Sequence, residues 1–444
     1  MKHIINIKPS TLTGKTVSIS GYRHSANLII AAIAALPLKK VTLNNVPFLE
    51  DINTMLHIFS ELGGIYQWID RTTLELRSDS IINHNVPSYL SQQIHSSLYY
   101  FPALVSRFSV ATIGQTGGCQ IGSQSLGFSR PFWHIASILK QSGCEIQKQH
   151  IDCKAIRRKL NNHYYFDIMN YSDHDNCLLG PHTSGATKTA ILGCLHADKI
   201  QIDHPFLRTE VLDLLSFLEQ VGYQVKFNDE YIEIVNLAQN HIVNYQLSAD
   251  PSEVVTFCAL AKYHQTNLVL HNIDDRVFNQ LQPDLYMLSN IGMHLTKHED
   301  RLEAISESIY RPQYMTFTPQ ELMTDHHPFY AILLHKAKSM SRIRELVWYE
   351  RFGYINELRK FGLNYYYRSG AINIIPARAQ AYHGILNGVD LRATVALMIL
   401  ATGIDAETKI DGYHHICRGY VDLIDKLQSL GIEASVVSRE CITP

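Results

Sequence analysis

A cysteine in a glycine-bearing stretch is the first group in this sequence that could do covalent chemistry. The stretch is TGGCQIG, and its thiol belongs to Cys119. A thiolate beside cations can act as a nucleophile or an acid–base group, whereas a cysteine in apolar surroundings is a small inert side chain. Taken by itself, the stretch favours the inert role.

The other cysteines and the histidines show no spacing typical of a metal site. None of the eight cysteines forms a CxxC pair or a zinc-type pattern, and we expect no disulfide framework in so long a chain. The pairs His326–His327 and His414–His415 are adjacent in sequence, so on a helix or strand their side chains point apart. We therefore expect no bound metal.

Composition narrows the class of protein. The 444 residues are 46% hydrophobic and 18% charged, with a formal net charge of −2, which is typical of a globular protein without a nucleic-acid or polybasic membrane face. The longest apolar run, residues 28–38, is too short to span a bilayer. The N-terminus lacks the pattern of a signal peptide, so we expect a cytoplasmic protein.

Six segments of the chain share one pattern: an amphipathic run, a glycine and an alternating run. The run predicts a helix with one buried face, the glycine fits the left-handed position past the helix end, and the alternation predicts a strand. The pattern predicts an α/β fold of six repeated βαβ-type units, three in each of two domains. The shared glycines are Gly63, Gly143, Gly222, Gly292, Gly362 and Gly431.

Arginines recur in the turn before the helix of a unit. Helix N-termini and guanidinium groups both favour anions, so this recurrence predicts an anionic ligand between the domains. For any single arginine, pairing with a surface acid remains an equal alternative. The four arginines are Arg130, Arg208, Arg351 and Arg418.

Three stretches, together with the repeats, resemble one known family. They are GGCQIG around Cys119, DLRATVAL from Asp390, and YHHICRGYVDLIDKL from Tyr413. Over nearly its whole length the chain resembles the enolpyruvyl transferases, above all the UDP-N-acetylglucosamine 1-carboxyvinyltransferase (MurA-like) branch. The resemblance implies two inside-out α/β barrels, residues 23–248 and residues 1–22 plus 249–444.

The resemblance also implies a reaction. The family transfers the enolpyruvyl group of phosphoenolpyruvate to an acceptor hydroxyl and releases phosphate. This chemistry needs a base for the acceptor proton, an acid for the methylene carbon, and cations that hold phosphate and carboxylate. It needs no metal or organic cofactor, and the enzyme can work as a monomer.

The cysteine and two aspartates take roles by the same resemblance. Cys119 matches the family's loop cysteine, which acts in protonation and product release and is alkylated by fosfomycin; EPSP synthases lack this loop. Asp325 matches the aspartate near the acceptor hydroxyl and is the candidate general base. The alternative for Asp325, a helix N-cap before PFYAILLHKA, is compatible with that role. Asp250 matches an aspartate at the second domain crossing and takes a hinge or structural role.

The substrate-binding residues are carried over in two groups. Arg392 and Arg418 match arginines that bind phosphoenolpyruvate, and Arg351 matches a third arginine of the cleft. A turn of small residues holds the acceptor's diphosphate in the family, and here it corresponds to Thr183, Ser184 and Gly185. Ala186 stands where a phosphate-binding loop of an ATPase would have lysine, which argues against an ATPase.

Several positions depart from the family pattern. A Lys–Asn pair of the family is replaced by Arg23–His24. Arginine keeps the charge but cannot shuttle a proton near neutral pH, which leaves His24 as the candidate for that role. His95 stands where the family has another arginine, and the arginine of the cysteine loop corresponds either to Arg130 or to Gln124.

These departures leave three interpretations open. A drifted UDP-N-acetylglucosamine enzyme of peptidoglycan synthesis is hard to reconcile with the loss of both the lysine and the asparagine. We favour a specialised paralogue that keeps phosphoenolpyruvate but uses a uridine nucleotide such as UMP, as in peptidyl-nucleoside antibiotic biosynthesis. The third interpretation is a non-catalytic nucleotide-binding paralogue, against which the retained Cys119 and Asp325 argue.

Overall fold

The computed structural model describes most of the chain, in two compact units. The terminal unit contains the described residues of the ranges 1–20 and 249–444, and the central unit contains those between 21 and 248. Cys119, Gln124, Arg130 and Thr183 lie outside the described residues. The described ranges are 3–118, 132–149, 152–170, 184–237, 240–318, 320–348 and 351–438.

Each unit contains three four-stranded sheets, and all six sheets repeat one pattern of pairing. The first two strands are parallel, and the third strand is antiparallel to both the second and the fourth. In the central unit the strands, in sheet order, are β14 (Ile242–Gln246), β3 (Lys40–Asn44), β5 (Leu74–Arg77) and β4 (Ile65–Trp68); β6 (Asn85–Val86), β7 (Val110–Ile113), β9 (Asp152–Arg157) and β8 (Cys144–Gln149); and β10 (His163–Asp167), β11 (Lys199–Asp203), β13 (Tyr231–Asn236) and β12 (Tyr223–Phe227).

The terminal unit repeats this arrangement, with two strands contributed by the N-terminal segment. β1 lies between β23 and β24, where Ile5 pairs with Ile410 on one side and Val436 on the other. Because β2 pairs with β15, the central unit is inserted in sequence between β2 and the helix that precedes β15. The strands are β2 (Thr16–Ser18), β15 (Leu268–His271), β17 (Arg301–Ser306) and β16 (Met293–His298); β18 (Tyr314–Phe317), β19 (Ser341–Glu345), β21 (Ala371–Ile375) and β20 (Asn364–Arg368); and β22 (Ile385–Asn387), β23 (Thr408–Asp411), β1 (His3–Ile7) and β24 (Ala434–Ser438).

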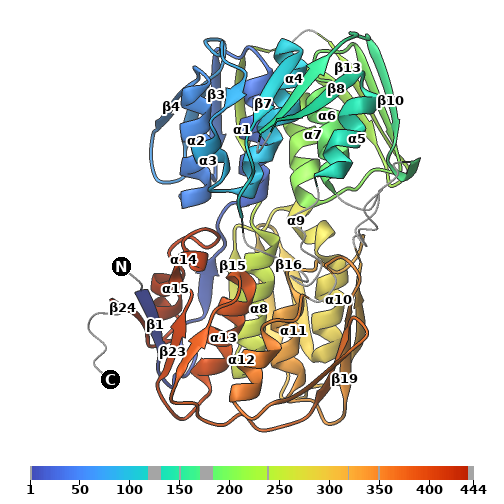
Figure 1. Cartoon of the computed structure of the whole chain (residues 1–444). Helices are drawn as coiled ribbons and strands as arrows, with labels where there is room; N and C mark the ends of the chain where they lie inside the picture. The colour runs from blue at the N-terminus through green and yellow to red at the C-terminus, as the bar shows by residue number, and fades with distance from the viewer. Residues whose placement is uncertain are drawn as a thin grey trace. The chain divides into compact units, whose positions relative to one another are not determined.

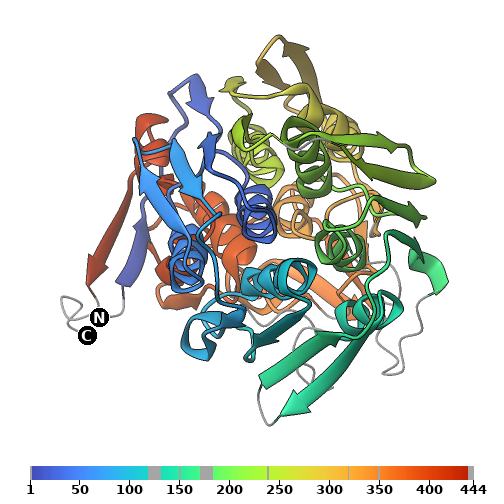
Figure 2. The ribbon, with the colours of Figure 1, turned by 90° about the horizontal axis from the view of Figure 1, so that it is seen from above.

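One helix of each repeat is buried on nearly all sides, as expected for a helix without a continuous polar face. In α13, for example, every residue is buried. In the central unit these helices are α1 (Arg23–Ala35), α4 (Tyr100–Phe108) and α6 (Ser184–Gly193); in the terminal unit they are α8 (Pro251–His264), α11 (His327–Leu334) and α13 (Leu391–Thr402). Figures 1 and 2 show such helices with the strands of the same unit outside them. The expected inside-out α/β fold of repeated units is confirmed.

The helices that follow in each repeat bury only one face. They are α2 (Glu50–Glu61), α5 (Trp133–Gln141), α7 (Thr209–Val221), α10 (Gln282–Ile291), α12 (Ile355–Lys360) and α15 (Leu423–Ser429). Short helical segments complete the described chain: α3 (Ser88–Ser91), η1 (His95–Tyr99), η3 (Ile168–Asn170), α9 (Asp275–Gln280) and α14 (Tyr413–Ile416). Within the described residues, no helix combines the length and the apolar content needed to cross a membrane.

The shared glycines end these one-sided helices, as the sequence pattern predicts. All six have a positive φ, between 74° and 116°, a region that costs other L-residues steric strain. Gly222 and Gly292 are the C-cap residues of α7 and α10, and the Gly292 amide donates to the Leu288 carbonyl oxygen at 3.2 Å. The repeated glycine thus turns the chain from each helix into the following strand.

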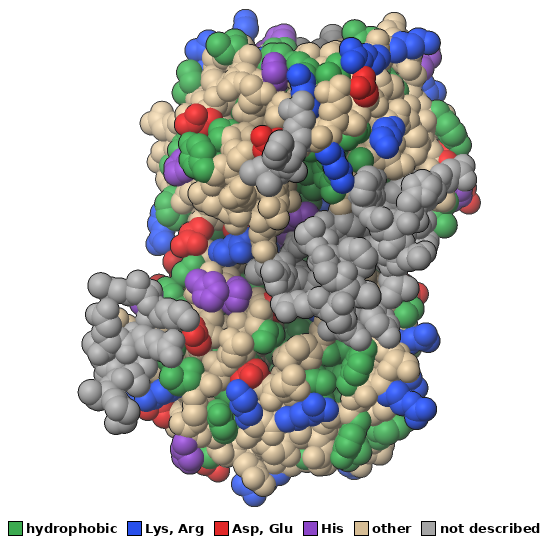
Figure 3. All heavy atoms as spheres, viewed as in Figure 1, with side chains coloured by type: hydrophobic (Ala, Val, Ile, Leu, Met, Phe, Trp, Pro, Cys, Tyr) green, Lys and Arg blue, Asp and Glu red, His purple; other side chains and the backbone are tan. Residues whose placement is uncertain are grey.

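Charged side chains are interspersed on the face that Figure 3 draws. Among the described residues shown there, basic and acidic groups alternate with apolar and neutral ones. This distribution agrees with the net charge of −2.

We expect Gly292→Ala to lower the free energy of unfolding by about 2 kcal/mol, because alanine is strained at this φ. A Cβ here would also lie 2.4 Å from the Ile309 carbonyl oxygen. Gly353→Ala is the matched control, since Gly353 is exposed and its nearest neighbour would be 3.9 Å away. Urea unfolding of both variants checks this; equal losses would contradict the strain argument.

Candidate active site

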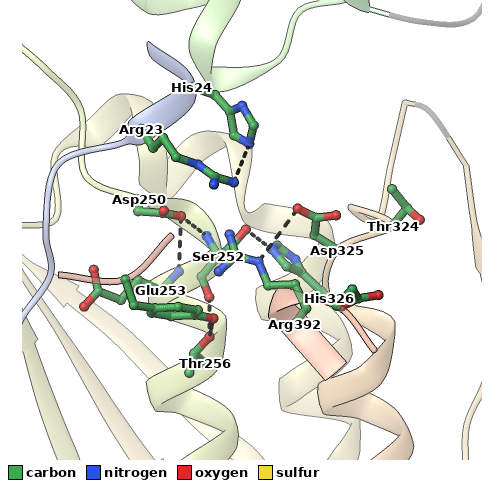
Figure 4. Close-up of polar contacts among 12 residues, drawn as sticks. Arg23, His24, Asp250, Ser252, Glu253, Thr256, Thr324, Asp325, His326 and Arg392 are labelled. Carbon is green, nitrogen blue, oxygen red and sulfur yellow. Dashed lines mark hydrogen bonds and ion pairs between the residues drawn. The ribbon is translucent and has the colours of Figure 1, made fainter. Parts of the chain in front are cut away.

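The N-terminal ends of α8, α11 and α13 carry a cluster of polar residues in the terminal unit (Figure 4). Asp250 is the N-cap of α8, and its Oδ1 accepts from the Ser252 amide at 2.8 Å. Asp390 is the N-cap of α13, and its Oδ1 accepts from the Ala393 amide at 2.8 Å. Each carboxylate satisfies N–H groups that a buried helix would otherwise leave without acceptors.

Asp325 lies at the centre of this cluster between two buried arginines. Its Oδ1 is 2.6 Å from Arg351 Nη1, and its Oδ2 is 3.7 Å from Arg392 Nε. The Asp325 side chain is 26% exposed, whereas those of Arg351 and Arg392 are 5% and 2% exposed. The structure therefore brings together three residues that lie 26 and 41 positions apart in sequence.

Asp325 is not a helix N-cap, so that alternative is wrong. The N-cap of α11 is His326, and no side chain caps this helix. Helix α11 begins one residue later than the apolar run suggests. The Asp325 carboxylate therefore does not cap the helix and pairs with the arginines instead.

Both arginines are held charged. Burial lowers the pKa of the Arg351 guanidinium, but Asp325 and Asp390 outweigh it and raise the pKa above its usual value. Burial likewise lowers the pKa of Arg392, while Tyr420, Asp250 and Asp325 raise it further than burial lowers it. Arg392 also stacks on Tyr420, with its Cζ 4.8 Å from the ring centroid.

Arg418 lies in the turn between α14 and α15, half-buried, and its amide donates to the His415 carbonyl oxygen at 3.3 Å. Burial lowers the pKa of His415 to about 4, and the neighbouring His414 and Arg418 lower it as well. Asp390 has the opposite effect and raises the pKa of the His415 ring. Arg418 therefore belongs to the same end of the unit as the N-cap of α13.

Arg23 and His24 begin α1 in the central unit. Arg23 Nη1 is 3.1 Å from Asp51 Oδ2, and these side chains are only 11% and 7% exposed. Arg23 Nη2 lies 3.3 Å from His24 Nε2, so the ring nitrogen acts as the acceptor in this contact. A guanidinium anchored in this way supplies positive charge and donor N–H groups but no exchangeable proton near neutral pH.

A second buried ion pair lies at the start of α6 and α7. Lys188 Nζ is 2.6 Å from Glu210 Oε1, and the side chains are 5% and 8% exposed. Lys188 also donates to Tyr99 Oη at 3.2 Å, and Ser184 Oγ donates to Glu210 Oε1 at 3.4 Å. Burial would raise the pKa of Glu210, but Lys188 and then His24 lower it to about 2. His24, which replaces the family's asparagine, therefore acts electrostatically on the carboxylate that pairs with Lys188.

Gly185 and His95 are set by close packing. A Cβ on Gly185 would lie 2.3 Å from His134 Nε2, so only glycine fits there. Burial, and then Lys188, lower the pKa of His134 to about 4, which leaves the ring neutral at pH 7. A Cβ on Gly118 would lie 3.0 Å from the Cβ of His95, so the segment leading to Cys119 passes directly over His95.

Sequence reasoning missed several members of these clusters. Lys188 and Glu210 are not among the site residues predicted from the sequence. A lysine inside the apolar stretch ATKTAIL nevertheless signals a buried and therefore paired charge. Asp390 is the first residue of DLRATVAL and directly precedes the apolar run, where an N-cap is expected. Ser252 and His326 gave no usable signal, because their partners come from other helices.

The predicted site residues are divided between the units. Asp325, Arg351, Arg392 and Arg418 lie in the terminal unit, whereas Arg23, His24, His95, Ser184 and Gly185 lie in the central unit. Their catalytic and binding roles stay predictions. The described residues contain no group of three or more His, Cys, Asp or Glu side chains that could hold a metal ion.

The geometry defines a class: a two-unit α/β enzyme whose buried helices present guanidinium and carboxylate groups at their N-termini, suited to anionic substrates. The chain belongs to the EPSP synthase (3-phosphoshikimate 1-carboxyvinyltransferase) family, whose model matches residues 7–427. It is accordingly an enolpyruvyl transferase, as the sequence resemblance implies.

Individual relatives agree with this assignment. The chain is 26% identical to the UDP-N-acetylglucosamine 1-carboxyvinyltransferase of Deinococcus deserti over 94% of both chains. It is also 26% identical to UDP-N-acetylglucosamine 1-carboxyvinyltransferase 2 of Staphylococcus aureus, over 97% of this chain and 98% of the relative.

Solved structures share the fold. The enolpyruvyl transferase NikO from Streptomyces tendae has 25% sequence identity and a TM-score of 0.87, covering 98% of this chain and 99% of that chain. EPSP synthase from Acinetobacter baumannii, at 14% identity and a TM-score of 0.75 over 98% and 100% of the two chains, shows the fold alone.

We expect Glu210→Gln to lower the free energy of unfolding by about 3 kcal/mol, because it leaves the Lys188 ammonium buried without a counter-ion. Adding Lys188→Met should restore part of the loss. The matched control is Glu145→Gln, whose partner Arg158 lies at a similar distance of 2.8 Å but is exposed, and which should change stability by less than about 1 kcal/mol. Equal effects of the buried and exposed changes in urea unfolding would refute this.

The same pair predicts a pH dependence. Because the folded-state pKa of Glu210 lies near 2 and its ordinary value is 4.5, its stabilising contribution is complete above pH 4.5 and is lost as the pH falls toward 2. The stability difference between the wild type and the Glu210→Gln, Lys188→Met double variant should shrink over this range. A difference that stays constant from pH 6 to pH 2.5 would contradict the assignment.

Proposed function

We propose that the protein transfers the enolpyruvyl group of phosphoenolpyruvate to a hydroxyl of a uridine nucleotide, with release of phosphate. We further propose that the acceptor is UMP or a related nucleotide. In this proposal residues 1–22 with 249–444 form the domain that holds the donor, and residues 23–248 form the domain that holds the acceptor.

The observation that carries the donor assignment is the set of buried guanidinium N–H groups without acceptors. In the described part of the chain, Nε and Nη1 of Arg392 and Nε of Arg351 have no hydrogen-bond acceptor. The two Nε atoms lie 3.7 Å and 3.9 Å from carboxylate oxygens of Asp325 and Asp390, too far for a hydrogen bond. Leaving a buried donor without a hydrogen bond costs free energy, which an anionic ligand would recover. A carboxylate and a phosphate, as in phosphoenolpyruvate, match these donors in charge and geometry.

The partial exposure of Asp325 supports its role as the base. Its carboxylate is 26% exposed, more than the side chains of the two arginines, so a substrate hydroxyl can reach it. In the proposed reaction the acceptor oxygen bonds to C2 of phosphoenolpyruvate, its proton passes to Asp325, and a proton adds to the methylene carbon. Loss of phosphate from C2 and of a proton from the methyl carbon then restores the double bond. We retain Cys119 as the candidate for proton transfer at that carbon.

Residues of the central unit support the proposal that the acceptor differs from UDP-N-acetylglucosamine. Arg23 is committed to Asp51 and His24 and offers charge without a transferable proton. Lys188 adds a buried ammonium beside Ser184 through Glu210, in a helix whose start corresponds to the diphosphate turn. Changed residues in the central unit, combined with a retained arginine cluster in the terminal unit, favour the same donor with a different acceptor.

UDP-N-acetylglucosamine is the second candidate acceptor. The specific observation in its favour is the 26% identity to UDP-N-acetylglucosamine 1-carboxyvinyltransferases over nearly the full chain.

The test is phosphate release from phosphoenolpyruvate with UMP or UDP-N-acetylglucosamine as acceptor, at matched concentrations. Turnover with UMP at a kcat/KM at least tenfold higher is the expected result. Turnover only with the sugar nucleotide would replace the proposed acceptor by the second candidate, and release with neither would remove both.

Asp325→Asn should lower kcat by about 100-fold or more, because the amide cannot accept the acceptor's proton. Calorimetric binding of phosphoenolpyruvate should survive, since the amide oxygen still accepts from Arg351. The control is Asp275→Asn, an 84% exposed aspartate of the same unit, which should keep full activity. Full turnover by Asp325→Asn would exclude it as the base.

A further inference from the structure

A buried chain of aspartate, histidine and serine lies directly beneath Asp325. His326 Nε2 is hydrogen-bonded to Ser252 Oγ at 3.1 Å, and its Nδ1 lies 2.9 Å from Asp284 Oδ1, at ion-pair distance. The three residues are 0%, 1% and 1% exposed. Figure 4 shows the His326 ring pointing to Ser252, while the adjacent Asp325 points to Arg392.

The three residues join the starts of three helices. Ser252 is in the first turn of α8, Asp284 in the first turn of α10, and His326 is the N-cap of α11. One turn into α11, Tyr330 Oη donates to Asp284 Oδ1 at 2.8 Å. Asp284 therefore contacts the start of α11 at two points: it accepts a hydrogen bond from Tyr330, and it lies at ion-pair distance from His326 Nδ1, which makes no hydrogen bond among the described residues.

The order of groups matches the nucleophile, base and orienting acid of serine hydrolases, but the burial argues against that role. A nucleophilic hydroxyl must reach its substrate, and Ser252 is 1% exposed. The proposed transfer also does not require a second nucleophile. The chain must therefore serve the groups beside it.

We propose that Asp284, His326 and Ser252 are positioning residues that fix the backbone at residue 326 and thereby hold the Asp325 carboxylate in its reactive orientation. The inference rests on the proposed function, since it assigns Asp325 as the base. His326 joins Asp325 by a single peptide bond, so a shift of the imidazole moves the carboxylate directly.

The need for such an anchor follows from the two arginines. Arg351 and Arg392 hold Asp325 now, yet they are also the groups that would bind phosphoenolpyruvate. When they turn toward an anion, their contacts to Asp325 weaken. The imidazole contacts Ser252 of α8 and Asp284 of α10 instead of the arginines, so these contacts are independent of the donor. A misplacement of about 1 Å at a reacting group can cost on the order of 100-fold in rate.

The test compares two serine-to-alanine variants of equal burial. Ser252→Ala removes the hydroxyl that fixes His326. Ser341→Ala, at the start of β19, also removes a fully buried hydroxyl, one that accepts from the Gln313 amide at 3.1 Å. We expect Ser252→Ala to lower kcat by about tenfold with KM for phosphoenolpyruvate unchanged within about twofold, and Ser341→Ala to leave both unchanged.

A second measurement does not depend on turnover. Hydrogen exchange of the amides from 322 to 330 should be faster in Ser252→Ala than in Ser341→Ala, because the start of α11 loses its anchor. In an Asp325→Asn background, Ser252→Ala should lower the residual kcat no further, since the chain acts only through Asp325.

The outcomes separate the two proposals. Faster exchange in Ser252→Ala, in a protein that releases phosphate with neither nucleotide, would support the anchor and overturn the acceptor assignment. Unchanged exchange and unchanged kcat would overturn the anchor. An additive loss of kcat in the Asp325→Asn background would also overturn it, because the chain would then act on another group.

Discussion

A helix that is buried on every side can offer polar chemistry only at its ends, and six such helices organise this protein. Their side chains fill the core, so backbone N–H groups at the N-termini are the polar groups that the core cannot satisfy. Carboxylates at Asp250 and Asp390 satisfy some of them. The same ends attract anions through the helix dipole, which makes them the natural position for a site that binds phosphate and carboxylate.

Charged side chains can be buried at these helix ends because each of them lies close to a group of opposite charge. Lys188 is paired with Glu210, Arg23 with Asp51, and Arg351 with Asp325. Against this background the N–H groups of Arg351 and Arg392 that lack acceptors are informative. A buried donor without a hydrogen bond is the kind of feature that a ligand completes. The two arginines that carry these donors both contact Asp325, whose carboxylate is partly exposed.

In the proposed function the central unit takes a different acceptor while the chemistry is kept. Two of its buried helices carry positive charge near their starts: a guanidinium at position 23 and an ammonium one turn inside α6 at position 188. A guanidinium holds anions with directional donors but does not exchange protons, so the exchange chemistry must lie elsewhere. In the proposed mechanism it lies with Asp325 and Cys119, on groups that the family retains.

The sequence alone determined the repeat, the helices and their ends, because periodicity, glycine at positive φ and apolar runs are local properties. It also indicated the family and the arginines, since each stands in a short characteristic stretch. It offered an N-cap as the alternative role for Asp325, and the structure gives that position to His326, because helix starts are set by a balance of neighbouring turns. Pairs such as Lys188 with Glu210 and His326 with Asp284 were decided only by the tertiary structure. Their members lie on different helices, 22 and 42 residues apart, and no local pattern reports which buried charges will meet when separate helices pack.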